Sequence, residues 1–267
     1  MISGAILIDM TERIALVTGA SSGLGKEFVM QLDREKDIDT FWVIARREEL
    51  LKELAEHCTK PVKAIAMDLT AEGSMEKLEA MLKEEQPVIT WMIAAAGLGK
   101  IGRTRDQSRR DDDLMISLNC QAAVDVTKIS LPYLKKGSHV VEISSIAAFQ
   151  PMPSFAVYGA SKAFLQSYTK ALHYELIGTG IHVTCICPYW VKDTEFMKTA
   201  DPCSQAKYYR HQPLKSTSAS VVKQSIRAAK MNLWVWTPGI VTTADRFFAK
   251  FVPHCIMTPI MDLWSRL

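Results

Sequence analysis

Short apolar runs alternate with longer amphipathic stretches along most of this chain, and this alternation limits the folds open to it. The apolar runs predict buried strands at 14–18, 41–45, 62–67, 88–94, 139–143 and 181–187. The spacing of apolar residues between them predicts helices at 23–32, 48–57, 74–85, 111–134 and 157–177. Strands and helices that alternate in this way form a parallel sheet with right-handed crossovers. We therefore expect a doubly wound α/β fold with helices on both faces of the sheet.

The composition is that of an ordinary soluble globular protein. The chain has 267 residues, of which 48% are hydrophobic and 23% charged, and an α/β fold of about 250 residues often forms one domain. A formal net charge of +3 argues against a dedicated nucleic-acid binder. The six cysteines form no CxxC pair and no zinc-like Cys/His spacing, so we expect no metal and a reducing cytoplasm.

No targeting or membrane segment is expected. The N-terminus lacks the basic region and cleavage site of a secretory signal. No apolar run approaches the roughly 18 residues that suggest a membrane span.

A glycine-rich loop joins the first predicted strand to the first predicted helix. It reads Thr18-Gly19-Ala20-Ser21-Ser22-Gly23-Leu24-Gly25. Glycines let the backbone approach a pyrophosphate closely, and the following helix N-terminus supplies free N–H groups and partial positive charge. A tight turn without a ligand is the alternative, but strand, loop and helix follow one another as dinucleotide binding requires.

A tyrosine and a lysine lie four residues apart at the start of a predicted long helix. Tyr158 and Lys162 therefore share one helix face. A phenol with a pKa of about 10 is a poor acid or base at neutral pH, and a nearby ammonium group lowers that pKa. Such a pair suits proton transfer to or from the oxygen of a ketone or an alcohol. A surface aromatic–lysine pair is the alternative.

The glycine loop and the Tyr158–Lys162 pair together resemble the short-chain dehydrogenase/reductase family. The resemblance covers about residues 12–195 and implies a single Rossmann-type domain. It implies that Ser145, thirteen residues before the tyrosine and just after the fifth strand, hydrogen-bonds the substrate oxygen. Ser144 is the neighbouring candidate for this role.

The resemblance implies two more catalytic roles. Asn119 matches the helix asparagine that positions a water in the family's proton relay, although a polar residue that merely bends the helix is the alternative. Lys162 would lower the pKa of Tyr158 and hold the cofactor ribose. The expected catalytic set is Asn119, Ser145, Tyr158 and Lys162.

The end of the second predicted strand bears on the choice of cofactor. NAD-dependent relatives carry an acidic residue there, but this chain has Arg46 and Arg47, which suit a 2′-phosphate. We expect NADP(H) rather than NAD(H), unless the arginines are ordinary surface residues. Asp68, after the third strand, would hydrogen-bond the adenine or cap a helix. The other implied cofactor contacts are the loop residues Thr18, Gly19, Ser21, Ser22, Gly23, Leu24 and Gly25, then Leu69, Ala96, Gly97, Tyr158, Lys162, Pro188 and Thr194.

Two segments depart from the family pattern. Ala94-Ala95-Ala96-Gly97 replaces Asn-Asn-Ala-Gly, so amides that tie neighbouring strands are missing. Pro188 is followed by Tyr189 instead of glycine, and Thr194 comes one residue late, so we expect a different local backbone. Tyr189 or Trp190 then either reaches the substrate side or simply packs.

The sequence therefore predicts an NADP(H)-dependent oxidoreductase that interconverts a ketone and a secondary alcohol. Aromatic and Met-rich residues in the lid, about 189–216, and in the tail, 240–267, favour a steroid-like or lipid-like substrate. The alternatives are a 3-oxoacyl thioester reductase and a non-catalytic NADP-binding regulator.

The organisation of the chain is predicted in the same way. We expect one domain over 1–239 and a homodimer or homotetramer. The tail would form a helix at 243–252, after which Pro253 and Pro259 break the chain. It would pack over the pocket or a partner subunit, in preference to plain core or a membrane surface.

Overall fold

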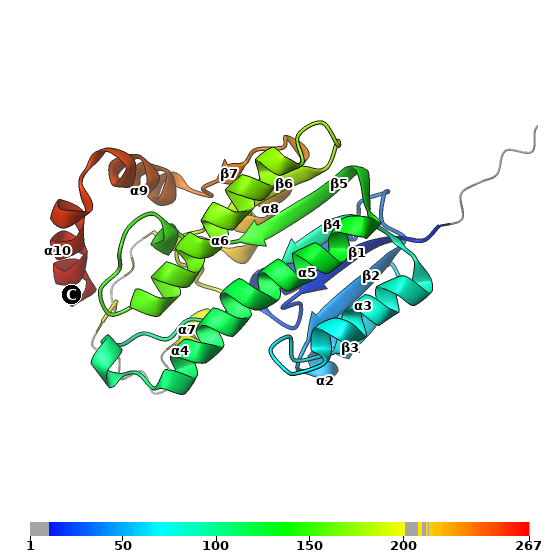
Figure 1. Ribbon diagram of the computed structural model, residues 1–267, viewed down its shortest axis with the longest axis horizontal. Coiled ribbons are helices and arrows are strands. Elements are labelled where there is room, and N and C mark those ends of the chain that lie inside the picture. Colours follow the sequence, from blue (N-terminus) through cyan, green and yellow to red (C-terminus); the bar gives the residue numbers. More distant parts are fainter. Residues whose placement is uncertain (1–10, 201–207, 210–211, 213, 267) are drawn as a thin grey trace, which may run out of the picture.

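A seven-stranded parallel sheet forms the centre of the computed structural model, which describes residues 11–200, 208–209, 212 and 214–266. Its strand order is β3-β2-β1-β4-β5-β6-β7, and every adjacent pair is parallel (Figure 1). The strands are β1 (Arg13–Thr18), β2 (Thr40–Ala45), β3 (Val62–Ala66), β4 (Val88–Ala94), β5 (Leu134–Ile143), β6 (His182–Ile186) and β7 (Val235–Trp236). The predicted doubly wound sheet is confirmed, and its order reverses between β1 and β4, where such sheets bind ligands.

Helices cover both faces of the sheet. They include α1 (Gly23–Leu32), α2 (Glu48–Glu56), α3 (Ser74–Glu85), α4 (Arg109–Ile116), α5 (Ala123–Ser130), α6 (Ala156–Glu175) and α8 (Ser218–Lys230). Apolar side chains of α1, α2 and α8 form one core with the sheet, and those of α3, α5 and α6 form the other. Figure 1 shows α3, α5 and α6 lying across the near face.

The central strands are largely apolar because both faces of the sheet are buried there. Ile14, Leu16 and Val17 of β1 have no exposed surface, and Trp42 of β2 and Trp91 of β4 are buried as completely. Strands of this kind appear in a sequence as continuous apolar runs. The predicted strand positions are therefore confirmed to within a residue or two at most ends, with β5 as the exception.

The segment predicted as one helix over 111–134 contains four elements. The first of them, α4, begins at Arg109, where the side chain of Ser108 caps the helix by accepting a hydrogen bond from the backbone N–H of Asp111. A π-helical turn, η2 (Ser117–Ala122), separates α4 from α5. Pro132 has no N–H to continue the helix, and the chain tightens into the 3-10 turn η3 (Leu131–Tyr133) before β5 begins at Leu134.

The tail forms two helices, α9 (Ile240–Phe251) and α10 (His254–Ser265). The prediction that Pro259 breaks the chain was wrong, since it lies inside α10. Pro259 has no N–H to donate to the preceding turn, but the helix continues past it to Ser265.

The inner sides of α9 and α10 pack against an aromatic cluster beside the functional pocket. Val241, Met261 and Trp264 contact this cluster, and the Trp264 ring lies edge-on to Tyr209 with ring centroids 5.8 Å apart. The outer sides carry exposed apolar side chains: Ile240, Phe247, Phe248, Phe251, Ile256, Ile260 and Leu263. Within the described residues, no helix is both long enough and apolar enough to cross a membrane.

Candidate active site

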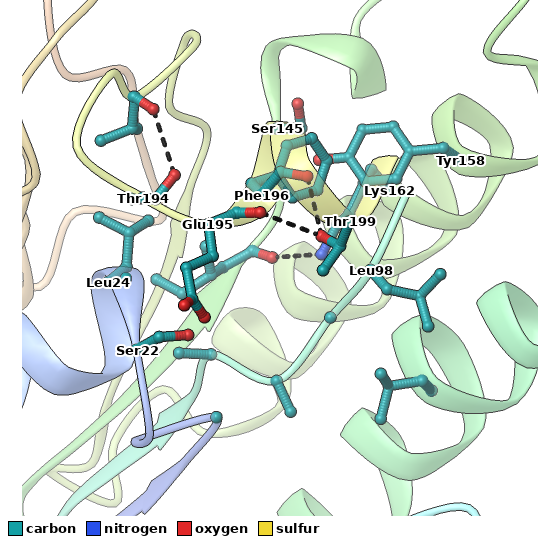
Figure 2. Close-up of a pocket in the computed structure, with 18 of the residues that line it drawn as sticks. Ser22, Leu24, Leu98, Ser145, Tyr158, Lys162, Thr194, Glu195, Phe196 and Thr199 are labelled. Carbon is teal, nitrogen blue, oxygen red and sulfur yellow. Dashed lines mark hydrogen bonds between the residues drawn. The ribbon is translucent and has the colours of Figure 1, made fainter. Parts of the chain in front are cut away.

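A pocket of about 550 Å³ opens at the carboxyl ends of the central strands. The loops after β1, β2 and β3 line one end, and the segments after β4, β5 and β6 line the other. Figure 2 shows Ser22 and Leu24 on the glycine-loop side, with Ser145 and Tyr158 across the pocket from them. Most predicted cofactor residues line this pocket, namely Gly19, Ser21, Ser22, Gly23, Leu24, Arg46, Arg47, Asp68, Leu69, Ala96, Gly97, Tyr158, Lys162, Pro188 and Thr194.

The glycine loop is folded too tightly for side chains at two positions. Gly19 has a φ of 66°, and a Cβ added to it would lie 2.8 Å from the Cα of Ala96. A Cβ on Gly25 would collide with the carbonyl oxygen of Gly19. The glycines thus let the loop, the α1 N-terminus and the end of β4 lie in contact around one end of the pocket.

Two predicted cofactor contacts, Thr18 and Gly25, lie behind the pocket wall instead of lining it. The Thr18 hydroxyl accepts hydrogen bonds from the backbone N–H groups of Ala95 and Ala96, at 3.2 and 3.1 Å. It thereby ties β1 to β4. The missing amide side chains were expected to remove hydrogen bonds between neighbouring strands. Thr18 partly replaces those hydrogen bonds.

The predicted catalytic side chains meet where β5 ends and α6 begins. Ser145 is hydrogen-bonded to Tyr158 and also accepts the backbone N–H of Ala147 at 3.1 Å. Ser144 turns away, and its hydroxyl donates to the carbonyl oxygen of Lys162 at 2.8 Å. The geometry therefore favours Ser145 over Ser144 as the partner of Tyr158, as the thirteen-residue spacing predicts.

Burial dominates the ionisation of the tyrosine and the lysine. It raises the pKa of Tyr158 to about 12, against a smaller lowering by Ser145. It lowers the pKa of Lys162 to about 8. The Lys162 Nζ donates to the carbonyl oxygen of Ile143 at 2.8 Å and lies 5.8 Å from the centroid of the Tyr158 ring. The lowered tyrosine pKa implied by the family resemblance is therefore not found in the folded chain alone.

Asn119 lies on the π-helical turn and is fully buried behind the pocket. Its Nδ2 donates to the carbonyl oxygen of Leu98 at 2.8 Å and to the Ser161 hydroxyl at 3.0 Å. Its Oδ1 accepts the backbone N–H of Leu98 at 2.9 Å. The side chain thus fixes the loop after β4 against the start of α6, and its part in a water relay stays a prediction.

Asp68 and Arg47 lie around the end of the pocket formed by β2 and β3. Burial acts to raise the pKa of Asp68, but hydrogen bonds from the N–H and hydroxyl of Thr70 outweigh it and lower the pKa. Arg47 donates to the Ser21 hydroxyl at 3.1 Å and forms an ion pair with Glu195 at 2.8 Å. The arginine predicted to bind a 2′-phosphate thus has a carboxylate partner from the lid.

Aromatic rings pack against Tyr158. The Phe155 ring stacks on the Tyr158 ring with centroids 4.2 Å apart and an angle of 18° between the planes. Phe196, on the short lid helix α7 (Phe196–Ala200), lies 5.4 Å from the Tyr158 ring. Tyr189 and Trp190 both line the pocket and also pack in the buried cluster around Phe155, so their reach to the substrate side stays a prediction.

Several lining residues carried no recognisable signal in the sequence. Glu195 and Phe196 belong to no motif, and Phe155 precedes the Tyr158 motif by three residues without being part of it. Only their position in the fold identifies them. Among the described residues, no three His, Cys, Asp or Glu side chains come together as a metal site. Part of the predicted lid, 201–207, 210–211 and 213, lies outside the described residues.

The chain matches the short chain dehydrogenase family over residues 13–204 and belongs to this family of oxidoreductases, which act on CH–OH groups of small molecules. An uncharacterized oxidoreductase of Staphylococcus epidermidis is 31% identical over 197 residues, which are 73% of this chain and 84% of the relative.

Solved structures share the fold. A serine dehydrogenase complexed with NADP⁺ is 27% identical with a TM-score of 0.75, covering 86% of this chain and 95% of that chain. A short-chain dehydrogenase from Burkholderia phymatum in complex with NAD is 19% identical with a TM-score of 0.74, covering 89% of this chain and 92% of that one.

Proposed function

We propose that the protein is an NADP(H)-dependent oxidoreductase that interconverts a ketone and a secondary alcohol. The observation that carries the proposal is the grouping of Ser145, Tyr158 and Lys162 at one end of a pocket whose other end is the glycine loop. Ser145 and Tyr158 would then handle the substrate oxygen at the end of the pocket opposite the glycine loop.

The described residues fit a dinucleotide. Ser22 and Gly23 line the pocket at the N-terminus of α1, where free N–H groups favour an anion such as a phosphate. Asp68 and Lys162 would hold the adenine and the nicotinamide ribose, and Pro188 and Thr194 would flank the nicotinamide. When bound, the cofactor supplies or accepts the hydride.

The protein's own groups handle the substrate oxygen and its proton. The Ser145 hydroxyl orients the oxygen by a hydrogen bond, and the Tyr158 hydroxyl gives its proton to that oxygen in reduction or takes it in oxidation. A pKa of about 12 makes the neutral phenol the resting form at neutral pH. Positive charge on Lys162 favours the phenolate that forms when the proton leaves.

Two observations support the proposed cofactor and the proposed substrate class. Arg46 and Arg47 line the pocket where a 2′-phosphate would lie, and no carboxylate follows β2 directly, which favours NADP(H) over NAD(H). The aromatic side chains around Tyr158 favour an apolar, steroid-like or lipid-like substrate. One domain over 1–239, a homodimer or homotetramer and a cytoplasmic location are further parts of the proposal.

Turnover of a ketone panel, followed by the absorbance of the reduced nicotinamide, tests the proposal. Tyr158→Phe should lower the rate by at least about 100-fold because it removes the proton donor, while NADPH binding persists. Tyr174→Phe is the matched control, since Tyr174 lies on the same helix and is exposed. If 3-oxoacyl thioesters react and no other ketone does, the protein is a 3-oxoacyl thioester reductase. If no substrate of either kind reacts while NADPH still binds, the protein is a non-catalytic regulator.

A further inference from the structure

A lysine that the mechanism above does not use lies at the end of the pocket that holds Tyr158. Lys100 follows β4 and lines the pocket as a half-buried side chain. The residue before it, Gly99, is packed so closely that an added Cβ would lie 2.8 Å from the Phe196 ring and 2.9 Å from the Phe155 ring. The centroids of these rings lie 5.4 and 4.2 Å from that of Tyr158. The segment that carries Lys100 therefore runs past the rings that pack on the catalytic tyrosine.

Two hydrogen bonds hold the backbone around Lys100 in place. The Gln107 Nε2 donates to the carbonyl oxygen of Lys100 at 2.7 Å. The backbone N–H of Ile101 donates to the carbonyl oxygen of Ala200, at the end of the lid helix α7, at 3.2 Å. The lysine is thus carried by a fixed segment, between the lid and the start of α4.

The ammonium group of Lys100 is bonded to a neutral group. Its Nζ donates to the backbone carbonyl oxygen of Thr199 on α7 at 2.9 Å, and Lys100 forms no ion pair within the part of the chain that the structure describes. In Figure 2, Thr199 lies on the side of the pocket that carries Ser145 and Tyr158. An ammonium group has three donor hydrogens, so Lys100 can bind an anion without releasing Thr199. A charge-assisted bond of this kind is roughly twice as strong as a bond between neutral groups.

The rest of this end of the pocket is mainly apolar. The segment after β4 contributes three leucines to the lining, Leu98, Leu114 and Leu118. The carboxylate of Asp111 also lines the pocket, but it accepts the hydroxyl of Ser108 at 2.9 Å at the start of its own helix. An elongated molecule with a carbonyl group, an apolar body and an anionic end matches this arrangement.

We propose that Lys100 determines substrate specificity by binding a carboxylate at the end of the substrate that is remote from the reacting carbonyl. The substrate class is then an amphipathic oxo-acid or hydroxy-acid. The inference rests on the function proposed above. The opposing interpretation is that Lys100 only holds α7 through Thr199.

Lys100→Gln separates the two interpretations, because a glutamine amide can still donate to Thr199 but carries no charge. Medium-chain oxo-acids, with the keto group at different distances from the carboxylate, are compared with their methyl esters as substrates. The wild type should have the higher kcat/KM for the acids. The variant should lower the acid-to-ester ratio by about fivefold, mainly through KM, as expected when a half-buried ion pair is lost.

Two further variants control the comparison. Lys100→Arg keeps the positive charge and should retain the preference for the acids. Lys223→Gln removes an exposed lysine of α8 that does not line the pocket, and it should leave the ratio unchanged. If Lys100→Gln slows acids and esters equally, the lysine only holds the lid helix and the proposal is overturned.

Binding without turnover gives a second readout. Calorimetric titrations of octanoate and 1-octanol into the protein with NADPH present should show the tighter binding for octanoate. Lys100→Gln should reduce the difference between the two ligands by about fivefold. An unchanged difference would contradict the role of Lys100 even if ketones are reduced. Loss of the difference in a protein that reduces no ketone would instead contradict only the proposed function.

Discussion

Gly19 shows how one residue can set the shape of one end of the pocket. Its left-handed φ of 66° is costly for any other residue, and the missing side chain leaves the end of β4 close enough to close the loop. Strain and collision act at the same position but can be separated by experiment. Another glycine of the chain has the strain without the collision.

Gly19→Ala should weaken NADPH binding by at least about tenfold, since a Cβ 2.8 Å from Ala96 must push the loop or β4 away from the pocket. Gly73→Ala is the control because Gly73 has a φ of 78° and nothing within 4 Å of an added Cβ. It should lower the Tm and leave the affinity unchanged. Equal affinities for the two variants, measured by nicotinamide fluorescence, would contradict the role given to the close approach.

At the scale of the elements, the tail helices have two unlike faces. Trp264 on α10 is half-buried against Tyr209, whereas Phe251 on α9 is 63% exposed. Both are large aromatic residues, so their truncation compares the two faces directly.

Trp264→Ala should lower the free energy of unfolding by about 2 kcal/mol, because it removes packing from the aromatic cluster. Phe251→Ala should change it by less than about 0.5 kcal/mol, as expected for an exposed side chain. Urea unfolding measures both. A loss for Phe251→Ala as large as that for Trp264→Ala would mean that the outer face is covered, and size-exclusion chromatography would then show whether a second copy covers it.

The elements also show where prediction from sequence succeeds. Strands such as β1 could be predicted because both of their faces are buried, and such strands have continuous apolar runs in the sequence. The π-helical turn could not be predicted, because its Asn119 is hydrogen-bonded to Leu98 and Ser161, which lie 21 and 42 residues away in the sequence. Motif residues of the site were predicted by their spacing, but Phe196 and Glu195 acquire their importance only from what the fold brings beside them.

At the scale of the whole molecule, one ion pair joins the cofactor end of the pocket to the lid. Arg47 and Glu195 are 148 residues apart in the sequence, and their side chains are each 46% exposed. A 2′-phosphate at Arg47 would compete with this carboxylate. If NADP(H) binds as proposed, the pair would couple the choice of cofactor to the segment that carries Phe196.

Glu195→Gln should tighten NADPH binding by about two- to fivefold, since an exposed ion pair contributes no more than about 1 kcal/mol. NADH binding should change little, because NADH has no 2′-phosphate. Glu53→Gln, which breaks the exposed Lys26–Glu53 pair, serves as the control. Titrations of both nucleotides measure these affinities. Equal effects of Glu195→Gln on NADPH and NADH binding would contradict the proposal that Arg47 binds the 2′-phosphate.

The π-helical turn has a consequence for how this chain can vary. Its wider coil accommodates a residue that a regular helix would not, and each residue rotates a helix by about 100°. Because α5 is held by the sheet, removing one residue from 117–122 would turn α4 about its own axis and swing Asp111 and Leu114 out of the pocket wall. Deletion of Ser117, which precedes Asn119, should thus alter which substrates fit while Asn119 keeps its hydrogen bonds to Leu98 and Ser161. The turn is therefore a point where specificity can change through chain length as well as through residue type.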